Sequence, residues 1–299
     1  MGITRNNMRI ALFGTPCSEQ FTKYIQHLVS RLESENVSLL VYEEYLFFLD
    51  KNVKFEKPPE VFDSYETLKD NADFLFSIGG DGTLLGSVTL VRDSNIPILG
   101  INTGRLGFIS SISTDQIESA INDVLNKNFQ IKNRTLLCLG TENNLFGKVN
   151  FALNEVAIVK KDTSSMIRID AFLNDEFLNS YWADGLVIAT PTGSTGYSLS
   201  CGGPIIIPGS ENIVITPIAP HNLNVRPIVL SDENIIKLKV ADKDQLALVS
   251  LDSRFRAFDS SNSLIIKKAD FKINLIEPQS HSFISTIRSK LMWGIDKRN

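Results

Sequence analysis

One segment near residue 80 combines glycines with a side chain that can take part in phosphate chemistry. Gly79-Gly80-Asp81-Gly82-Thr83 follows the apolar run 74–78 and precedes an apolar stripe with helical spacing. Glycines let backbone N–H groups converge on a phosphate, and a helix start adds its positive dipole end. A carboxylate there repels phosphate, so we expect Asp81 either to take a proton from a hydroxyl or to hold Mg²⁺. The alternative is a glycine-rich turn with a surface aspartate.

A second segment, Asn102-Thr103-Gly104-Arg105-Leu106-Gly107-Phe108, follows the next expected strand. Ligands of α/β sheets bind outside the carboxyl ends of the strands, which is where this segment would lie. Leu106 and Phe108 are interpreted as packing residues, and Arg105 either stabilises phosphate charge or is solvated. The residues expected to contact phosphate or ATP are Gly79, Gly80, Gly82, Thr83, Asn102 and Arg105.

Two polar patterns lie in the second half of the chain. Asn154-Glu155 interrupts the apolar run 151–159, so these side chains either face a ligand or face water at a strand end. They offer donors and acceptors that suit ribose hydroxyls or an adenine edge. The segment Asp184–Pro204 is an apolar strand that enters a Thr-, Ser- and Gly-rich loop, with a helical turn from about Tyr197. Such a loop is a polar, uncharged cradle for a nucleotide, with Tyr197 able to pack on a base; the alternative is an ordinary Ser/Thr-rich turn.

The elements that position these residues differ between the two halves of the chain. Short apolar runs at 9–13, 37–41, 74–78 and 96–101 alternate with helical stripes, which predicts an α/β N-terminal domain with a doubly wound parallel sheet. The period changes near residue 112. After one more helix, capped by Ser113 and Gln116, the remaining segments predict a mainly antiparallel β C-terminal domain. We therefore expect domains at 1–112 and 113–278, with a helical segment 279–299 that packs back on the first.

Composition excludes several classes of protein. The 299 residues carry 30 Lys and Arg against 34 Asp and Glu, a net charge of −4, which gives no basic surface for nucleic acid. No apolar run approaches a membrane span or a signal-peptide core. Three widely spaced cysteines show no metal-like pairing. These features favour a cytoplasmic protein that acts on small molecules.

Taken together, the motifs resemble those of the NAD kinase family. The segments at 79–82, 102–108, 154–155 and 184–204 occur in the family's order, and Thr216–His221 with Arg226-Pro227 resembles a further family segment. The resemblance spans about residues 8–278. It implies a two-domain enzyme in which ATP, with a divalent metal such as Mg²⁺, phosphorylates the adenosine ribose 2′-hydroxyl of NAD⁺ to give NADP⁺.

The resemblance also implies roles for individual residues. Asp81 matches the family's proton acceptor. The positions matching dinucleotide contacts are Asp81, Gly82, Asn154, Glu155, Asp184, Thr195, Gly196, Tyr197, Ser198, Leu199 and Ser200, with Ala219 in the adenine pocket. No resident metal ligands are expected.

This sequence departs from the family pattern at three places. Gly196 stands where alanine is common, Trp182 where some members carry a basic residue, and Asp252-Ser253-Arg254 where Gly-Gln often follows the aspartate. We expect the first change to be harmless and the others to affect the outer dinucleotide contacts.

The assembly and two alternative functions complete the expectations. Together with the many short strands, the resemblance favours a homodimer or homotetramer, because a monomer would leave strand edges exposed. The alternatives are a diacylglycerol-type lipid kinase, which shares the Asp81 loop, and a protein that senses NAD(P) without turnover.

Overall fold

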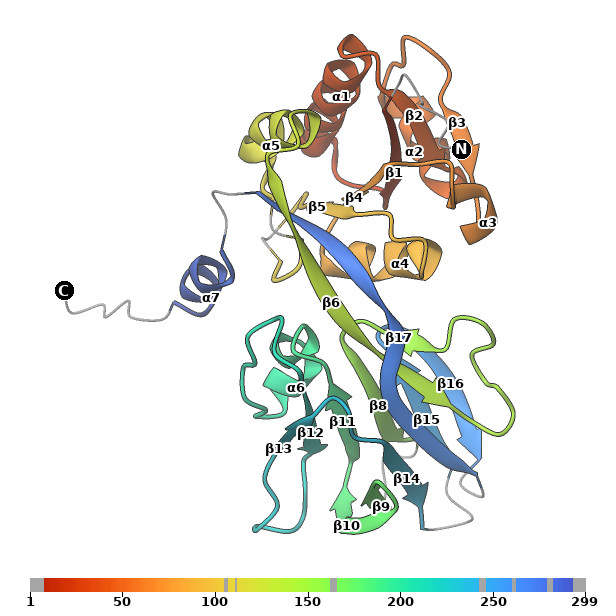
Figure 1. Cartoon of the computed structure of the whole chain (residues 1–299), viewed down its shortest axis with the longest axis vertical. Coiled ribbons are helices and arrows are strands. Elements are labelled where there is room, and N and C mark those ends of the chain that lie inside the picture. Colours follow the sequence, from red (N-terminus) through yellow and green to blue (C-terminus); the bar gives the residue numbers. More distant parts are fainter. Residues whose placement is uncertain are drawn as a thin grey trace, which may run out of the picture. The chain divides into compact units, whose positions relative to one another are not determined.

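The computed structural model describes residues 8–104, 107–110, 112–161, 166–241, 246–259, 262–278 and 282–292. The chain forms two compact units (Figure 1). Unit 1 contains residues 1–133 and 273–299, and unit 2 contains residues 134–272. Two long strands, β6 (Phe129–Gly140) and β17 (Ser263–Pro278), have residues in both units.

Unit 1 contains a parallel sheet with the strand order β3-β2-β1-β4-β5, extended by the end of β17 beside β5. Its further elements are β1 (Arg9–Gly14), α1 (Glu19–Ser34), β2 (Ser38–Tyr42), α2 (Glu43–Asn52), β3 (Glu60–Phe62), α3 (Tyr65–Leu68), β4 (Phe74–Ile78), α4 (Asp81–Val91), β5 (Ile98–Ile101), η1 (Thr114–Gln116), α5 (Ile117–Leu125) and α7 (Phe283–Leu291).

Helices cover both faces of this sheet. On one face, α1, α2 and α5 bury their apolar stripes against alternate residues of the strands, which form one hydrophobic core. On the other face lies α4, because its Leu84 packs close to Gly100 of β5 and its Gly86 lies near the ring of Phe13 in β1. The expected doubly wound α/β arrangement is confirmed.

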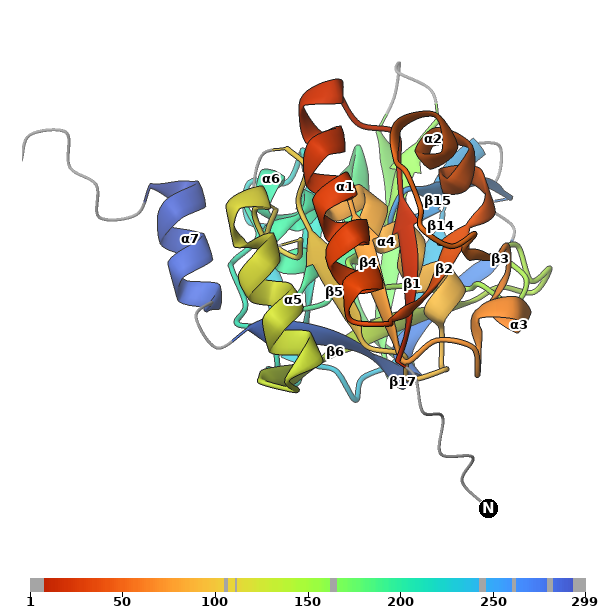
Figure 2. The same cartoon turned by 90° about the horizontal axis from the view of Figure 1, so that it is seen from above.

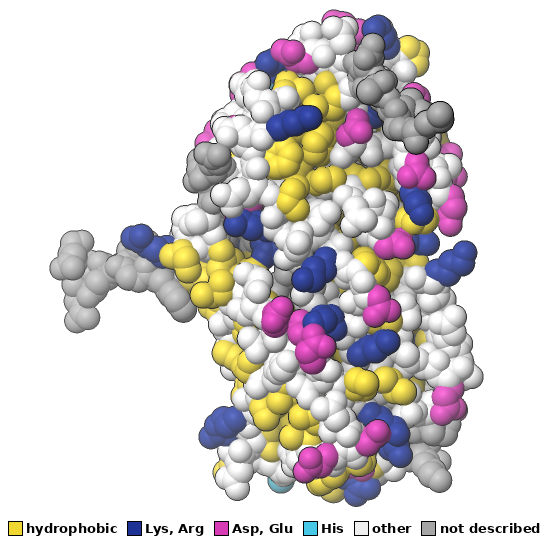
Figure 3. Space-filling model, viewed as in Figure 1, with side chains coloured by type: hydrophobic (Ala, Val, Ile, Leu, Met, Phe, Trp, Pro, Cys, Tyr) yellow, Lys and Arg dark blue, Asp and Glu magenta, His cyan; other side chains and the backbone are white. Residues whose placement is uncertain are grey.

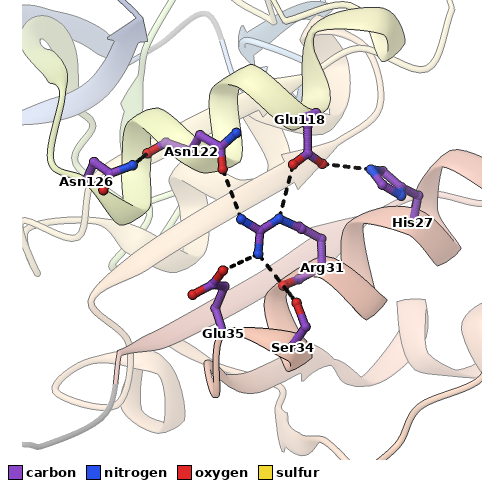
Figure 4. A network of polar contacts seen from close by, with 7 residues as sticks. All are labelled: His27, Arg31, Ser34, Glu35, Glu118, Asn122 and Asn126. Carbon is purple, nitrogen blue, oxygen red and sulfur yellow. Dashed lines mark hydrogen bonds and ion pairs between the residues drawn. The ribbon is translucent and has the colours of Figure 1, made fainter.

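Polar contacts join α1 to α5, which lie side by side in Figure 2. Glu118 of α5 accepts hydrogen bonds from Arg31 Nε at 3.1 Å and contacts His27 Nε2 at 2.8 Å. Arg31 also donates to Asn122 at 3.1 Å and pairs with Glu35 (Figure 4). Ser113 and Gln116 form the expected capping box before α5. Unit 1 therefore extends to residue 133, beyond the boundary at 112 that the change of period suggested.

Unit 2 consists of two sheets with short helical turns. One sheet has the order β10-β9-β14-β17 and the other β13-β12-β11-β8-β15-β16, with antiparallel pairing in each. The elements are β7 (Phe151–Ala152), β8 (Glu155–Lys160), β9 (Ile167–Leu173), β10 (Glu176–Ala183), β11 (Gly185–Ala189), η2 (Gly193–Thr195), α6 (Tyr197–Ser200), β12 (Asn212–Ile218), β13 (Ile228–Ser231), β14 (Ile236–Val240), β15 (Leu246–Leu251) and β16 (Arg254–Asp259).

The core of unit 2 lies between its two sheets. Buried residues of both sheets, such as Ile169 and Leu238 on one and Ile158 and Ile188 on the other, belong to one hydrophobic cluster. The mainly antiparallel β character expected of this half of the chain is confirmed. The apolar run 151–159 is divided between β7 and β8, and residues 263–278 form the single long strand β17.

The surface matches the balanced composition. Figure 3 shows one face, on which acidic and basic side chains are interspersed. None of the helices within the described ranges has both the length and the apolar character to cross a bilayer.

Candidate active site

In unit 1, the two glycine-containing loops meet because of the sheet register. Strands β4 and β5 are parallel, with Ile78 beside Ile101, so the loops that follow them leave the same edge of the sheet. The first loop begins α4 with Asp81. The second carries residues 108–110, whose backbone N–H groups point at the Asp81 carboxylate.

Asp81 accepts three backbone hydrogen bonds from that second loop. Its Oδ2 accepts from Phe108 N at 2.8 Å, and its Oδ1 accepts from Ile109 N at 3.2 Å and Ser110 N at 2.9 Å. An ionised carboxylate offers about four lone-pair positions, two on each oxygen. Among the contacts of the described residues, one position on Oδ2 therefore remains. The carboxylate can thus hold the loop and still accept one further proton or bind one cation.

The loop before Asp81 leaves room for a ligand. A Cβ at Gly80 or at Gly82 would meet no atom within 4 Å, whereas a Cβ at Gly79 would lie 2.2 Å from Thr83 Oγ1. Thr83 also bonds the hydroxyl of Thr15, 3.1 Å away in the loop after β1. Thr15 was not among the expected site residues. Its position at the carboxyl end of a parallel strand is the signal that would have indicated it.

Asn102 and Arg105 were both expected to contact phosphate. Asn102 is buried, and its side chain accepts from Gly104 N at 2.7 Å and donates to Ser110 O at 3.5 Å, so it shapes the second loop. Arg105, like Leu106, lies outside the described residues. Phe108 is half-buried, and Lys290 Nζ of α7 lies 4.6 Å from the centre of its ring.

In unit 2, Asp252 holds the segment that carries Asn154 and Glu155. Strands β15 and β8 are antiparallel, with Leu251 opposite Val156, so Asp252 emerges opposite Glu155. Asp252 Oδ2 accepts from Leu153 N at 2.9 Å, and Oδ1 accepts from Asn154 N at 2.8 Å and Glu155 N at 3.1 Å. In sequence Asp252 appeared only as part of a departure from a motif. An acidic residue directly after an apolar strand was the available signal.

The Ser- and Thr-rich loop is bound to the same segment. Thr190 donates its backbone N–H to Asn154 O at 2.9 Å and its hydroxyl to Leu153 O at 2.6 Å. A Cβ at Gly193 would lie 2.1 Å from Asn154 O, so only glycine allows this approach. The structure therefore brings together two motifs that lie about forty residues apart.

Both side chains of the Asn154-Glu155 pair carry an unsatisfied oxygen. Asn154 Oδ1 and Glu155 Oε2 are buried, and neither has a hydrogen-bond partner among the described residues. Glu155 is 9% exposed. Burial, and then the charge of Asp252, raises the pKa of Glu155 to about 8, although a backbone hydrogen bond from Tyr197 opposes the rise. Buried polar atoms in native proteins are usually satisfied, so each of these two oxygens is open to a partner such as an ordered water or a bound ligand.

The other expected dinucleotide residues divide into outward and inward groups. Tyr197 and Ser200 are exposed, and so is Ala219, which has a φ of +44°. Ser198 is fully buried, and its hydroxyl bonds that of Thr216 at 2.8 Å. Thr195 and Leu199 are half-buried, and the Thr195 hydroxyl donates to Thr192 O at 3.2 Å.

Asp184, another expected dinucleotide residue, is paired within the protein. Its Oδ1 lies 2.6 Å from Lys160 Nζ, and both side chains are partly exposed. Lys160 was missed in the sequence because it ends an otherwise apolar strand and belongs to no motif.

Comparisons with known proteins identify the family. Residues 11–129 match the model of the ATP-NAD kinase N-terminal domain, and residues 153–277 match that of the ATP-NAD kinase C-terminal domain. The NAD kinase of Christiangramia forsetii is 47% identical over 98% of this chain and all of the relative, and that of Flavobacterium psychrophilum is 48% identical with the same coverage. The chain belongs to the NAD kinase family.

Solved structures of kinases agree in fold. An NAD kinase from Archaeoglobus fulgidus in complex with ATP superposes with a TM-score of 0.73 at 26% identity, covering 95% of this chain and 99% of that one. Yeast NADH kinase complexed with NADH gives a TM-score of 0.86 at 22% identity, covering 98% and 90% of the two chains.

The three departures from the NAD kinase pattern have distinct surroundings. A Cβ at Gly196 would lie 3.1 Å from Glu155 Oε2, so an alanine there would press on the unsatisfied oxygen. Trp182 is half exposed at the edge strand β10. Arg254 turns inward, donates to Val149 O at 2.6 Å and to Phe151 O, and thereby holds the chain before β8.

Proposed function

We propose that Asp81 is the proton acceptor of an ATP-dependent NAD⁺ kinase. The reaction follows from membership of the NAD kinase family, whose relatives align with the chain along nearly its full length. It phosphorylates the adenosine ribose 2′-hydroxyl of NAD⁺ and gives NADP⁺ and ADP. The observation that carries the role of Asp81 is the acceptor position that its contacts with the described residues leave open, beside glycines that leave space for phosphate.

The proposed step is a single phosphoryl transfer. The ribose oxygen forms a bond to the γ-phosphorus, the bond from that phosphorus to the β,γ-bridging oxygen breaks, and ADP leaves. The hydroxyl proton passes to Asp81 Oδ2. A ribose hydroxyl is a poor nucleophile, and a general base of this kind contributes about 10²–10⁴ in rate.

Mg²⁺ is proposed to enter as part of the MgATP substrate. In such complexes phosphate oxygens and waters fill most of the coordination sphere, and the protein adds one or two carboxylates. The free position on Asp81 is assigned here to the hydroxyl proton, and its use by the metal is the rival role that the Asp81→Asn variant separates. Within the described ranges no three His, Cys, Asp or Glu residues gather to form a metal site of their own.

The dinucleotide is proposed to bind unit 2 through Asn154, Glu155, Asp184, Thr195–Ser200 and Ala219. The two unsatisfied oxygens of Asn154 and Glu155 support this assignment. Phosphate contacts are assigned to Gly79, Gly80, Gly82 and Thr83, with Asn102 shaping the adjoining loop. We add Thr15 to the phosphate contacts because its hydroxyl bonds that of Thr83.

We further propose that the enzyme works in the cytoplasm as a homodimer or homotetramer. Strands β13 and β16 form the two edges of one sheet in unit 2, and Val229 and Phe255 on them are 45% and 56% exposed. Exposed strand edges with apolar side chains favour pairing with another chain. Light scattering at micromolar concentration tests the assembly, and a fully active 33 kDa monomer would contradict it.

One turnover experiment tests the function. The protein is incubated with MgATP and either NAD⁺ or diacylglycerol, and NADP⁺, phosphatidic acid and ADP are measured. NADP⁺ formation supports the proposal, phosphatidic acid indicates the lipid kinase, and NAD⁺ binding without product indicates a sensor.

The role of Asp81 is tested with Asp81→Asn. The variant loses the base, and its amide nitrogen can no longer accept an N–H bond from the 108–110 loop. We expect kcat to fall at least about a hundredfold. A lost base leaves the rate low at any Mg²⁺ concentration, whereas a lost metal ligand is partly rescued by excess Mg²⁺ or Mn²⁺. Near-normal turnover would contradict both roles.

A further inference from the structure

We propose that Asp252 is a positioning residue for the dinucleotide, which fixes the backbone of residues 153–155 and keeps Glu155 protonated as a hydrogen-bond donor to the ligand. This inference rests on the proposed function, because it concerns the same NAD⁺ site. Asp252 is thereby added to the proposed NAD⁺ site. It is not proposed to touch NAD⁺ itself, and it acts through Asn154 and Glu155.

The backbone contacts of Asp252 are reciprocal. Its carboxylate accepts three consecutive N–H groups, from Leu153, Asn154 and Glu155, and its own N–H donates to Glu155 O at 3.0 Å. The residue has a φ of +52°, the left-handed conformation that the two-residue turn between β15 and β16 favours, and this turn lies opposite Glu155. The segment can shift only if these bonds break together.

The charge of Asp252 is not neutralised by an ion pair among the described residues. Arg254, two residues later, donates its N–H groups to the backbone oxygens of Val149 and Phe151. Burial raises the pKa of Asp252 overall, and the three N–H bonds and the charge of Arg254 oppose only part of the rise. Both carboxylate oxygens accept N–H bonds, which is the set of contacts that an ionised carboxylate makes, and its charge bears on Glu155.

The surroundings of Glu155 favour its neutral form. The ionisable groups around it are Asp252 on one side, with Arg254 beyond, and Tyr197 and Cys201 of the α6 region on the other. None of these places a cation on the carboxyl, and its pKa lies near 8. At neutral pH Glu155 therefore carries a proton and can donate, while Asn154 Oδ1 beside it accepts. Such a pair fits a ligand group that offers both an acceptor and a donor.

The test is calorimetric titration with NAD⁺ between about pH 6.5 and pH 9.5, a range chosen around the pKa of Glu155, together with steady-state KM values. For the wild type we expect constant affinity below pH 8 and a progressive loss above it. Glu155→Gln keeps a donor that does not ionise, so its affinity for NAD⁺, whatever its value at pH 7, should not change with pH over this range.

Asp252→Asn removes the charge and one acceptor for the N–H groups. We expect the decline in affinity to begin at lower pH, and KM for NAD⁺ to rise about tenfold while KM for ATP stays nearly constant. The matched control is Asp232→Asn, a buried aspartate of the same unit paired with Lys268 at 2.9 Å. It should lower Tm without moving the pH profile of NAD⁺ binding.

Three outcomes would overturn the inference. The first is an unchanged pH profile and an unchanged KM for NAD⁺ in Asp252→Asn. The second is a shift of the pH profile in Asp232→Asn as large as the shift in Asp252→Asn. The third is a Glu155→Gln variant that keeps the wild-type pH dependence. The last remains decisive if Asp252→Asn does not fold. If the wild type forms NADP⁺ in any of these cases, only the inference about Asp252 fails and the proposed function stands. If the wild type neither binds nor phosphorylates NAD⁺, both the inference and the proposed function fail.

Discussion

Asp81 and Gly107 are in such close contact that a Cβ on Gly107 would lie 1.7 Å from Asp81 Oδ1. The glycine therefore makes possible the three N–H bonds that the following residues give to the carboxylate. The carboxylate of Asp81, to which we assign the chemistry, therefore lies where a side chain on residue 107 would be.

Gly107→Ala should consequently impair catalysis although it adds only one methyl group. The added atom must displace either the carboxylate or the loop, and overpacking of this kind costs about 1–3 kcal/mol. We expect kcat to fall about tenfold or more and Tm to drop. The matched control is Gly104→Ala in the same loop, where the nearest atom to a Cβ would be Asn102 Oδ1 at 3.9 Å. If the two variants had similar kcat values, the close contact between Gly107 and Asp81 would not matter for catalysis.

Asn154→Ala should weaken NAD⁺ binding without weakening the fold. Removing a ligand-facing polar group costs about 1–3 kcal/mol, which corresponds to a five- to hundredfold rise in KM for NAD⁺. KM for ATP should change little. Tm should hold, because Asn154 Oδ1 has no partner among the described residues. In contrast, Asn102→Ala removes an amide bonded to Gly104 and should lower Tm. Loss of Tm in Asn154→Ala, with both KM values raised, would make Asn154 structural.

Glu155→Gln should stabilise the protein increasingly as the pH rises. The folded-state pKa of Glu155 is raised to about 8, so the folded protein binds a proton that the unfolded chain has already released above its ordinary value. Wild-type stability therefore declines between the ordinary pKa of a glutamate and about 8, by up to about 1.4 kcal/mol for each pH unit crossed. Glutamine does not titrate. Thermal melts at pH 5 and pH 8.5 should show a larger advantage of the variant at pH 8.5, and an equal difference at both would contradict the assignment.

Gly82→Ala should weaken ATP binding without lowering the stability of the fold. The position lies in the first turn of α4, and a Cβ would meet no atom within 4 Å. Alanine in a helix is favoured over glycine by about 0.5–1 kcal/mol, so Tm should hold or rise. KM for ATP should rise nonetheless, because the methyl group enters the space that we assign to phosphate. An unchanged KM for ATP would place the phosphate elsewhere.

The sequence indicated the strands that carry the motifs because each is a short apolar run followed by glycine or polar residues. The four apolar runs expected in the first half correspond to β1, β2, β4 and β5, and the Ser113 capping box follows from the same local signals. Helix α2 was missed because Tyr45, Leu46 and Leu49 adjoin the apolar strand β2 without a turn residue between them. Strands β10, β13 and β16 were missed because edge strands carry mixed polar and apolar residues with a weak period.

The contacts within the site could not be obtained from periodicity. That Asp252 reaches residues 153–155 depends on the register of β15 against β8, nearly a hundred residues apart in sequence. That Gly107 must be glycine depends on how closely two loops pack. Local patterns name the residue types that chemistry requires, but the register of distant strands decides which of them meet.

The discontinuity of unit 1 has a consequence for how the protein is made. Strand β5 is flanked on one side by β4 and on the other by β17, where Ile98 lies beside Leu275. On the ribosome, residues 134–272 must be synthesised between these two partners. A nascent chain therefore carries an N-terminal sheet with one open edge throughout synthesis of unit 2, although N-terminal segments generally fold first. Until β17 is made, this edge is open to pairing with other chains, so faster synthesis of unit 2 or a chaperone on the edge should limit misassembly.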